Sequence, residues 1–366
     1  MSVSRVSILI LGVSIFGVAC SDPPTASARA GRPAPTPSIG HLTGSVLLGR
    51  YEGAVEHYVT MTPAGAGETE IFEAEGCAPC VVLSPDGTHA STPAFSDDGL
   101  TTAIVSVDGT DRRMLSIPGI AGAWSPDSLS LALGVGFEDS PKKTGIYTAR
   151  AADGSDLTQV TTSGHDEFHE PFAWSPDGRR LLFFVERGPI GAVTHAGDLF
   201  VVKTDGSGMR RLNPAGVVVG RVTSAGTPAT WSPDGRSIAF AGFDRGTEGD
   251  RSAVFVATAP DGRARRITDW GSMIASAAWS PTEDLIAFSE LGGPQVALVT
   301  PDGELRTLSA PGHRIGSPVW SPDGSYLLVR RAMGPGGVLV VVDLQGEVVT
   351  TVTRRPGDYF GYAWEG

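Results

Sequence analysis

The sequence has 366 residues, a formal net charge of −12 at pH 7 and a pI of about 5.0. A chain this acidic repels the phosphate backbone of nucleic acids instead of releasing its counterions, which argues against a nucleic-acid partner. The 48 Gly and 27 Pro, together with few apolar residues spaced three and four apart, predict short strands joined by turns and almost no helix beyond the N-terminus.

The first 19 residues form a separate unit. One basic residue, Arg5, precedes a mostly apolar stretch from Val6 to Ala19 that is too short to span a bilayer permanently. This pattern predicts a signal peptide over residues 1–19. The letters GVAC at its end resemble the bacterial lipobox, which implies that Cys20 is lipidated and becomes the first mature residue. The alternative is an ordinary secretory signal followed by a chance cysteine.

Residues 20–41 contain the letters SDPPTASARAGRPAPTPS, which are rich in Pro, Ala and Ser and lack apolar periodicity. Such a segment buries too little surface to fold, so it is expected to be a semi-extended tether. The folded part is expected to span residues 42–366. We therefore expect an extracytoplasmic bacterial protein, in the periplasm or at the cell surface, that contacts the membrane through its lipid alone.

The letters TWSPDGRSIAFAG, residues 230–242, recur along the chain at intervals of 41 to 57 residues. Repeats of this length are typical of propeller blades, each a four-stranded antiparallel sheet. In complete copies, Pro presets φ for a tight turn and Gly accepts a positive φ. The anchors of the repeat are Leu83, Trp124, Trp174, Trp231, Trp279, Trp320 and Trp364, the first six followed by Ser-Pro.

The two ends of the repeat region complement each other. Three expected strands near the N-terminus, SVLLGRYEG, HYVTMTPAG and ETEIFEA, lack an inner partner, while YFGYAWEG at the C-terminus lacks followers. Together they make one blade, and pairing them removes the open edge of a linear array. The prediction is an all-β fold, a monomeric seven-bladed β-propeller closed by its N- and C-terminal strands. Six or eight blades are the alternatives.

These repeats resemble the TolB-type family of WD40-like propeller repeats, whose pattern is W-S-P-D-G, an apolar strand, then a strand ending in D-G and an Arg-Arg-Leu-Thr edge. The resemblance covers residues 42–366 and implies a propeller in the cell envelope. We expect no α/β domain ahead of the repeats, where TolB-type proteins carry one. We also expect no hydrolase domain after them, in contrast to the propeller-containing peptidases.

Polar residues gather in one loop, GHDEFHEP at residues 164–171, at the end where propeller loops converge on the axis. No nucleophile elbow, phosphate-binding loop or H-E-x-x-H motif accompanies it. In an extended segment, His165, Glu167 and His169 alternate onto one side, so the two histidines are candidate metal ligands. The competing hypothesis is a structural or solvated role, because a Gly-His pair commonly precedes the inner strand of WD40-type repeats. The other candidate ligand-binding residues are Glu170, His195, Asp198 and His313.

Cys77 and Cys80 form a C-A-P-C motif. In an exported chain, two thiols this close are expected to be oxidised or bound to metal. A strand follows instead of the helix that a redox pair requires, and Val81 stands where a haem-attachment motif has His. A small disulfide between Cys77 and Cys80 is predicted, with redox exchange and metal binding as alternatives.

These features favour a lipid-anchored scaffold that binds a protein or glycan of the cell envelope, without catalytic residues or a resident cofactor. The alternative is a metal-assisted glycan lyase or hydrolase whose site lies on the axial loops and holds a divalent ion. The repeat pattern is common to both classes, since a fold does not fix its function.

Overall fold

The described part of this computed structural model is an all-β unit. It belongs to the compact body Ile39–Gly366 and contains no apolar helix of the length needed to span a bilayer. The predicted signal peptide and tether lie outside the described residues. The structure describes residues 42–52, 55–74, 81–97, 99–136, 144–164, 167–187, 196–220, 229–244, 246, 251–259, 261–271, 273–290, 293, 295–308, 317–333, 336–353, 355–357 and 359–366.

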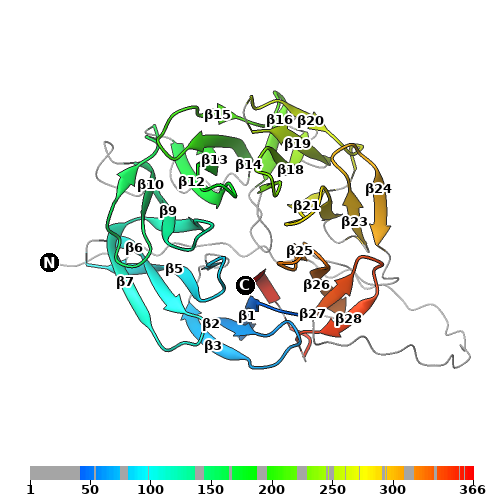
Figure 1. Ribbon diagram of the computed structural model, residues 1–366, viewed down its shortest axis with the longest axis horizontal. Coiled ribbons are helices and arrows are strands. Elements are labelled where there is room, and N and C mark those ends of the chain that lie inside the picture. Colours follow the sequence, from blue (N-terminus) through cyan, green and yellow to red (C-terminus); the bar gives the residue numbers. More distant parts are fainter. Residues whose placement is uncertain are drawn as a thin grey trace, which may run out of the picture. The chain divides into compact units, whose positions relative to one another are not determined.

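The described strands form antiparallel sheets that follow one another around a ring within this unit (Figure 1). One four-stranded sheet contains both chain ends, in the spatial order β29(Tyr359–Glu365), β1(Ser45–Glu52), β2(Val55–Met61) and β3(Thr69–Ala74). The next two sheets along the chain are formed by β4(Val82–Leu83), β5(His89–Ser96), β6(Gly99–Ser106) and β7(Arg112–Pro118), and by β8(Ile120–Trp124), β9(Ser130–Val135), β10(Gly145–Arg150) and β11(Thr158–Gln159). Two sheets near the C-terminus are formed by β21(Ile274–Trp279), β22(Ile286–Glu290), β23(Val296–Val299) and β24(Leu305–Leu308), and by β25(Val319–Trp320), β26(Tyr326–Met333), β27(Gly336–Asp343) and β28(Val348–Thr351).

Two further four-stranded units are joined into one larger sheet. A short strand in the connection between them, β16(Val217–Gly220), pairs with the start of β14(Ala196–Lys203) and the end of β18(Ser237–Asp244). The Asn213 side chain shapes this connection, because its amide donates to the carbonyl of Val217 at 2.7 Å. The strands of the two units are β12(Glu167–Trp174), β13(Arg180–Arg187), β14(Ala196–Lys203) and β15(Arg210–Arg211), then β17(Ala229–Trp231), β18(Ser237–Asp244), β19(Ser252–Thr258) and β20(Ala264–Arg266).

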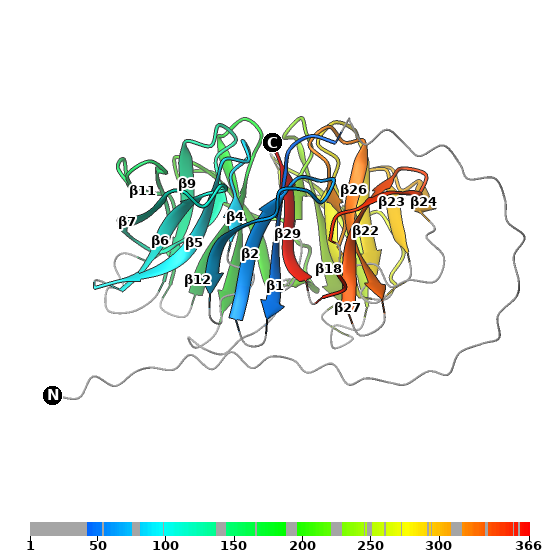
Figure 2. The ribbon, with the colours of Figure 1, turned by 90° about the horizontal axis from the view of Figure 1, so that it is seen from below.

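These pairings confirm the predicted all-β class and its antiparallel four-stranded sheets. The strands of successive sheets stand side by side along one common direction (Figure 2). Because the hairpins within each sheet turn back at the two ends of the strands, loops gather at two opposite ends of the unit. One end holds the tight turns after the inner strands. At the other end the inner strands begin.

The first and last strands of the described chain pair with each other. β29 lies antiparallel to β1, in a register that runs from Ser45 opposite Glu365 to Arg50 opposite Tyr359. The indole Nε1 of Trp364 donates to the carbonyl of Thr43 at 2.8 Å, which adds a contact between the two chain ends. The C-terminal strand therefore completes the sheet of β1, β2 and β3 (Figure 1).

The S-P-D-G turns are held by one repeated hydrogen-bond pattern. In the copy after Trp231, Ser232 Oγ donates to Asp234 Oδ1 at 2.6 Å and accepts from the Ser237 backbone N–H at 2.9 Å. Asp234 also accepts from the Arg236 backbone N–H at 2.9 Å. The same Ser–Asp hydrogen bond joins the pairs Ser84–Asp86, Ser125–Asp127, Ser175–Asp177 and Ser321–Asp323.

Apolar clusters fill the spaces between successive sheets, and the repeat tryptophans belong to them. Trp320 is 7% exposed and packs among β22, β23 and β26 through residues such as Leu298 and Leu327. Its Nε1 donates to the carbonyl of Ala278 at 2.8 Å. Burying a side chain of this size contributes about 2–3 kcal/mol. Trp320 therefore joins its own sheet to the preceding one.

We expect Asp234→Asn to lower the free energy of unfolding at pH 7 by about 1 kcal/mol, because a charged acceptor of two hydrogen bonds is lost. The hydrogen bond from Ser232, then that from Arg236, lowers the pKa of Asp234. A carboxyl whose pKa is lowered by folding stabilises above its unfolded pKa of about 3.9 and loses this effect as pH falls through the folded value.

Urea unfolding of the two proteins at several pH values measures this difference. It is expected to be full at neutral pH and to shrink below about pH 3.9. Glu304→Gln, at an exposed turn, is the control for loss of one negative charge. A constant difference at all pH values would contradict the role of the Asp234 charge.

Candidate functional site

A group of polar side chains lies at the end where the inner strands begin. Glu167 is the first residue of β12, and it stands opposite Arg187, the last residue of β13. Asp198 lies near the start of β14, opposite Val185. The antiparallel order of β12, β13 and β14 thus brings these three polar residues to one end of the sheet.

An ion-pair network connects these residues. Arg187 donates from Nε to Glu167 Oε1 at 2.9 Å and from Nη1 to Asp198 Oδ2 at 2.6 Å. The other Asp198 oxygen, Oδ1, lies 2.9 Å from Arg211 Nη2 and accepts from Asn213 Nδ2 at 2.9 Å. Asp198 is 5% exposed, so its charge is compensated by two guanidinium groups and one amide inside the protein.

The network holds both carboxylates in their ionised form. Burial alone would raise the pKa of Asp198, but the hydrogen bonds from Asn213 and Arg187 and the charge of Arg211 outweigh it and lower the pKa. Burial is likewise outweighed at Glu167, where Arg187 lowers the pKa. Neither carboxyl therefore has the raised pKa that a general acid requires near neutral pH.

His169 is packed beside this network and is 2% exposed. Its Nδ1 lies 2.9 Å from Thr161 Oγ1, which itself accepts from the Ile146 backbone N–H. The Thr161 hydroxyl hydrogen is thus available to Nδ1, and we assign the ring proton to Nε2, which lies 3.8 Å from Glu167 Oε2. Burial lowers the pKa of His169 despite the nearby Glu167 charge. The imidazole is therefore neutral near pH 7.

Among the residues predicted from the sequence, the structure places three together. Glu167 and His169 lie two positions apart on β12 and share a side, and Arg187 connects Glu167 to Asp198. Glu170 occupies the next position of β12, where the strand alternation directs it to the other face. The other predicted positions, which lie outside the described residues and stay predictions, are Cys20, Cys77, Cys80, His165, His195 and His313.

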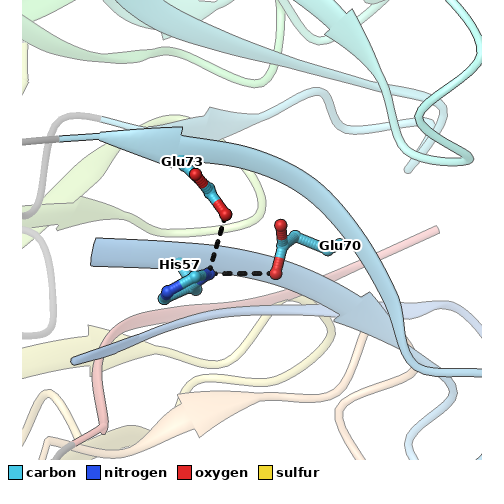
Figure 3. A group of neighbouring side chains, drawn as sticks. All are labelled: His57, Glu70 and Glu73. Carbon is cyan, nitrogen blue, oxygen red and sulfur yellow. Dashed lines mark hydrogen bonds and ion pairs between the residues drawn. The ribbon is translucent and has the colours of Figure 1, made fainter. Parts of the chain in front are cut away.

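A second cluster combines a histidine with carboxylates on the sheet that contains both chain ends. His57 on β2 points toward Glu70 and Glu73 on β3 (Figure 3). Its Nδ1 lies 3.0 Å from Glu70 Oε2 and 3.5 Å from Glu73 Oε1. On the opposite side of the ring, Nε2 lies 3.9 Å from Glu52 Oε2 of β1. These donor atoms are of the types that bind divalent metal ions.

Sequence reasoning missed this cluster because a β-bulge creates it. Residues three apart on a regular strand point to opposite faces, so Glu70 and Glu73 are not expected together. In the structure Val59 pairs with Glu70 and His57 pairs with Glu73, with an extra residue, Ile71, between the pairs. The bulge restores both glutamates to the face of His57. No local sequence signal predicted its position.

One protein-family model matches the C-terminal part of the chain. Residues 190–366 match the family model described as TolB beta propeller domain. No curated protein sequence matches the chain.

Two solved structures with TM-scores above 0.5 share the fold at low sequence identity. Oligogalacturonate lyase from Vibrio parahaemolyticus is 13% identical, with 79% of this chain and 83% of that chain covered and a TM-score of 0.57. A putative 6-phosphogluconolactonase from Bacteroides fragilis is 15% identical, with 90% and 100% covered and a TM-score of 0.52. TolB from Acinetobacter baumannii is 18% identical, with 87% and 81% covered and a TM-score of 0.47.

We expect Asp198→Asn to lower the free energy of unfolding by about 2–3 kcal/mol, because it leaves the two guanidinium groups facing each other without their shared carboxylate. Chemical denaturation at pH 7 measures the loss. Asp302→Asn is the matched control, since that side chain is 94% exposed and lies 3.3 Å from Arg265. The control is expected to change stability by less than about 0.5 kcal/mol. Equal losses in both variants would show that the network does not stabilise the sheet.

Proposed function

We propose that this chain, which carries TolB-type propeller repeats, is a lipid-anchored extracytoplasmic scaffold that binds a partner of the cell envelope. The partner class we favour is a protein, with a glycan as the second class. The signal sequence, the lipobox-like GVAC and the Pro-rich segment support export and anchoring through Cys20. The proposal places the unit at the membrane surface, joined to it by the tether and the lipid, as a monomer.

The proposed architecture is a ring of seven blades closed by the two chain ends. The pairing of β29 with β1 supports the closure. So does the packing of the closing sheet against both neighbours, through Leu48 with Leu339 on one side and Leu47 with Leu83 on the other. In this arrangement every sheet has a covered face on each side, and a rigid platform results.

The observation that carries the binding proposal is the ion-pair network at the end where the inner strands begin. Glu167 and Asp198 are ionised and compensated, and the neutral ring of His169 is buried. These groups are arranged to hold one shape instead of exchanging protons with a substrate. Fixed charges on rigid strand ends suit the recognition of a partner surface.

An exposed aromatic side chain gives this end an apolar contact point. Phe95 lies near the end of β5, beside the hairpin to β6, and is 76% exposed. Exposed aromatic residues are frequent energetic centres of protein interfaces. Leu129 is also exposed, at 62%, but it lies in the tight turn between β8 and β9 at the opposite end. Substituting each of these two side chains therefore tests which end of the unit binds the partner.

We expect Phe95→Ala to weaken capture of the envelope partner by roughly 30-fold in Kd, since losing an interface aromatic costs about 2 kcal/mol. The protein, immobilised through the exposed Lys203, is incubated with detergent-solubilised envelope. The captured partner is identified, and its affinity is then measured by titration. Leu129→Ala is expected to bind like the wild type. Both substitutions are exposed, so both variants are expected to keep the wild-type melting temperature.

The same purified protein can be used to distinguish the scaffold proposal from the enzyme alternative. A metal-assisted lyase or hydrolase would act through His165 and His169, and the buried Nε2 of His169 has no hydrogen-bond partner among the described residues. Such an enzyme would shorten an acidic polysaccharide in the presence of Mn²⁺ or Zn²⁺. Metal-dependent chain cleavage that His169→Gln abolishes, together with no effect of Phe95→Ala on capture, would overturn the scaffold proposal.

We expect Cys20→Ser to move the protein from the detergent phase of a membrane preparation to the soluble fraction, because the thioether that carries the lipid is lost. Metabolic labelling with a fatty acid is expected to mark the wild type and not the variant. Ser21→Ala is the neighbouring control and is expected to leave the protein in the membrane. A Cys20→Ser protein that stays membrane-bound and labelled would show that the anchor lies elsewhere.

A further inference from the structure

We infer that His57, Glu70 and Glu73 form a binding site for a divalent transition-metal ion, with Zn²⁺ as its best match. The site lies on the sheet of β29, β1, β2 and β3, away from the predicted His165 and His169. It is independent of the proposed scaffold function, because neither partner capture nor membrane anchoring is part of the argument.

The distances suit a shared ion. The ligand atoms of His57, Glu70 and Glu73 all lie within 4.8 Å of one another. A tetrahedral Zn²⁺ with bonds of about 2.0–2.2 Å holds its ligand atoms about 3.3 Å apart. The measured separations from His57 Nδ1, 3.0 Å to Glu70 and 3.5 Å to Glu73, are close to this value. Figure 3 shows both carboxylates directed at the same ring nitrogen.

One imidazole nitrogen cannot satisfy both carboxylates with a proton. A single Nδ1–H donates to one main acceptor, so either Glu70 or Glu73 is left without a donor there. Among the described side chains, His57 is the one ion-pair partner within 4 Å of these two glutamates. A divalent cation bound by the deprotonated Nδ1 would accept both carboxylates and offset their repulsion.

Arg50, whose charge also acts on Glu70, makes its direct contacts with other carboxylates. It lies 3.0 Å from Glu52 and also donates to Glu68. The cluster therefore has four glutamates around one arginine and one histidine. This excess of negative charge attracts a cation to the position between Glu70 and Glu73.

The site is held by structure on three sides. The His57 side chain is 13% exposed and lies on the middle strand of β1, β2 and β3. The bulge at Ile71 fixes both glutamates on its face. Glu52 lies 3.9 Å from Nε2, on the side where metal-bound histidines usually have a carboxylate that accepts the second ring N–H.

The donor set and exposure select the kind of ion. One imidazole and two carboxylates suit Zn²⁺, whereas Ca²⁺ takes six to eight oxygen ligands. The Glu70 and Glu73 side chains are 43% and 59% exposed, so water reaches the remaining coordination position. An open site of this kind accepts a further ligand from solvent or from a partner.

The test is a zinc titration of the intact protein, by calorimetry and by equilibrium dialysis with metal analysis. The double variant Glu70→Gln and Glu73→Gln keeps side-chain size and removes both anionic ligands. The control variant Glu304→Gln and Glu347→Gln makes the same charge change at exposed positions in turns that precede β24 and β28. His57→Gln is a second test of the same site through its nitrogen ligand.

We expect the double variant and His57→Gln each to bind one Zn²⁺ fewer than the wild type, or to bind that ion at least about 100-fold more weakly, since even outer partners of a metal contribute about 10- to 100-fold. The control variant and a tenfold excess of Ca²⁺ are expected to leave this ion bound. Zinc uptake unchanged in both site variants, no zinc uptake by the wild type, or equal competition by Ca²⁺ would each overturn the inference. If circular dichroism shows that one of these variants does not fold, the Zn²⁺ binding of the single variant Glu70→Gln is the deciding measurement.

Discussion

The packing of each sheet against its neighbours is the interaction on which the rest of the structure depends. Strands such as β13 and β18 are buried on both faces, with Leu181 to Val185 and Ile238 to Ala241 inside the protein. A sheet with two apolar faces is stable only when both faces are covered. Because β29 pairs with β1, the two ends of the described chain share one sheet. Trp320 adds a hydrogen bond between neighbouring sheets through its contact with Ala278.

Apolar side chains fill the faces of the sheets. The polar residues discussed here lie at the ends of the strands. At one end the Ser and Asp of each S-P-D-G turn satisfy one another and the local backbone, so these turns are closed units with little left to offer a ligand. At the other end, side chains from different strands bond to each other, as Arg187 does to Glu167 and Asp198. The repeated turns are thus alike, whereas this ion-pair network belongs to one sheet.

The features predicted well from the sequence are those encoded within a few residues. The turn at Asp234 and Gly235 follows from φ preferences and short side chains, and the repeat spacing then gives the antiparallel sheets. The features that were missed need information about neighbouring strands. Arg187 appears in the sequence as one more strand-end residue, and only the pairing of β12 with β13 and β14 shows that it joins two carboxylates. Likewise β16 was not predicted, because its pairing depends on Asn213 turning the chain toward β14 and β18.

The sheet built from both chain ends combines these effects. Its strands β1 and β2 contribute apolar residues to the clusters shared with two other sheets, while its outer strand β3 contains the bulge at Ile71, where Glu70 and Glu73 lie next to His57. A cation bound between these carboxylates, as inferred above, would offset their repulsion next to the pairing of β3 with β2. An ion that binds only the folded form raises the free energy of unfolding in proportion to the logarithm of the ion concentration. Metal binding at this site would therefore stabilise the sheet in which β29 pairs with β1.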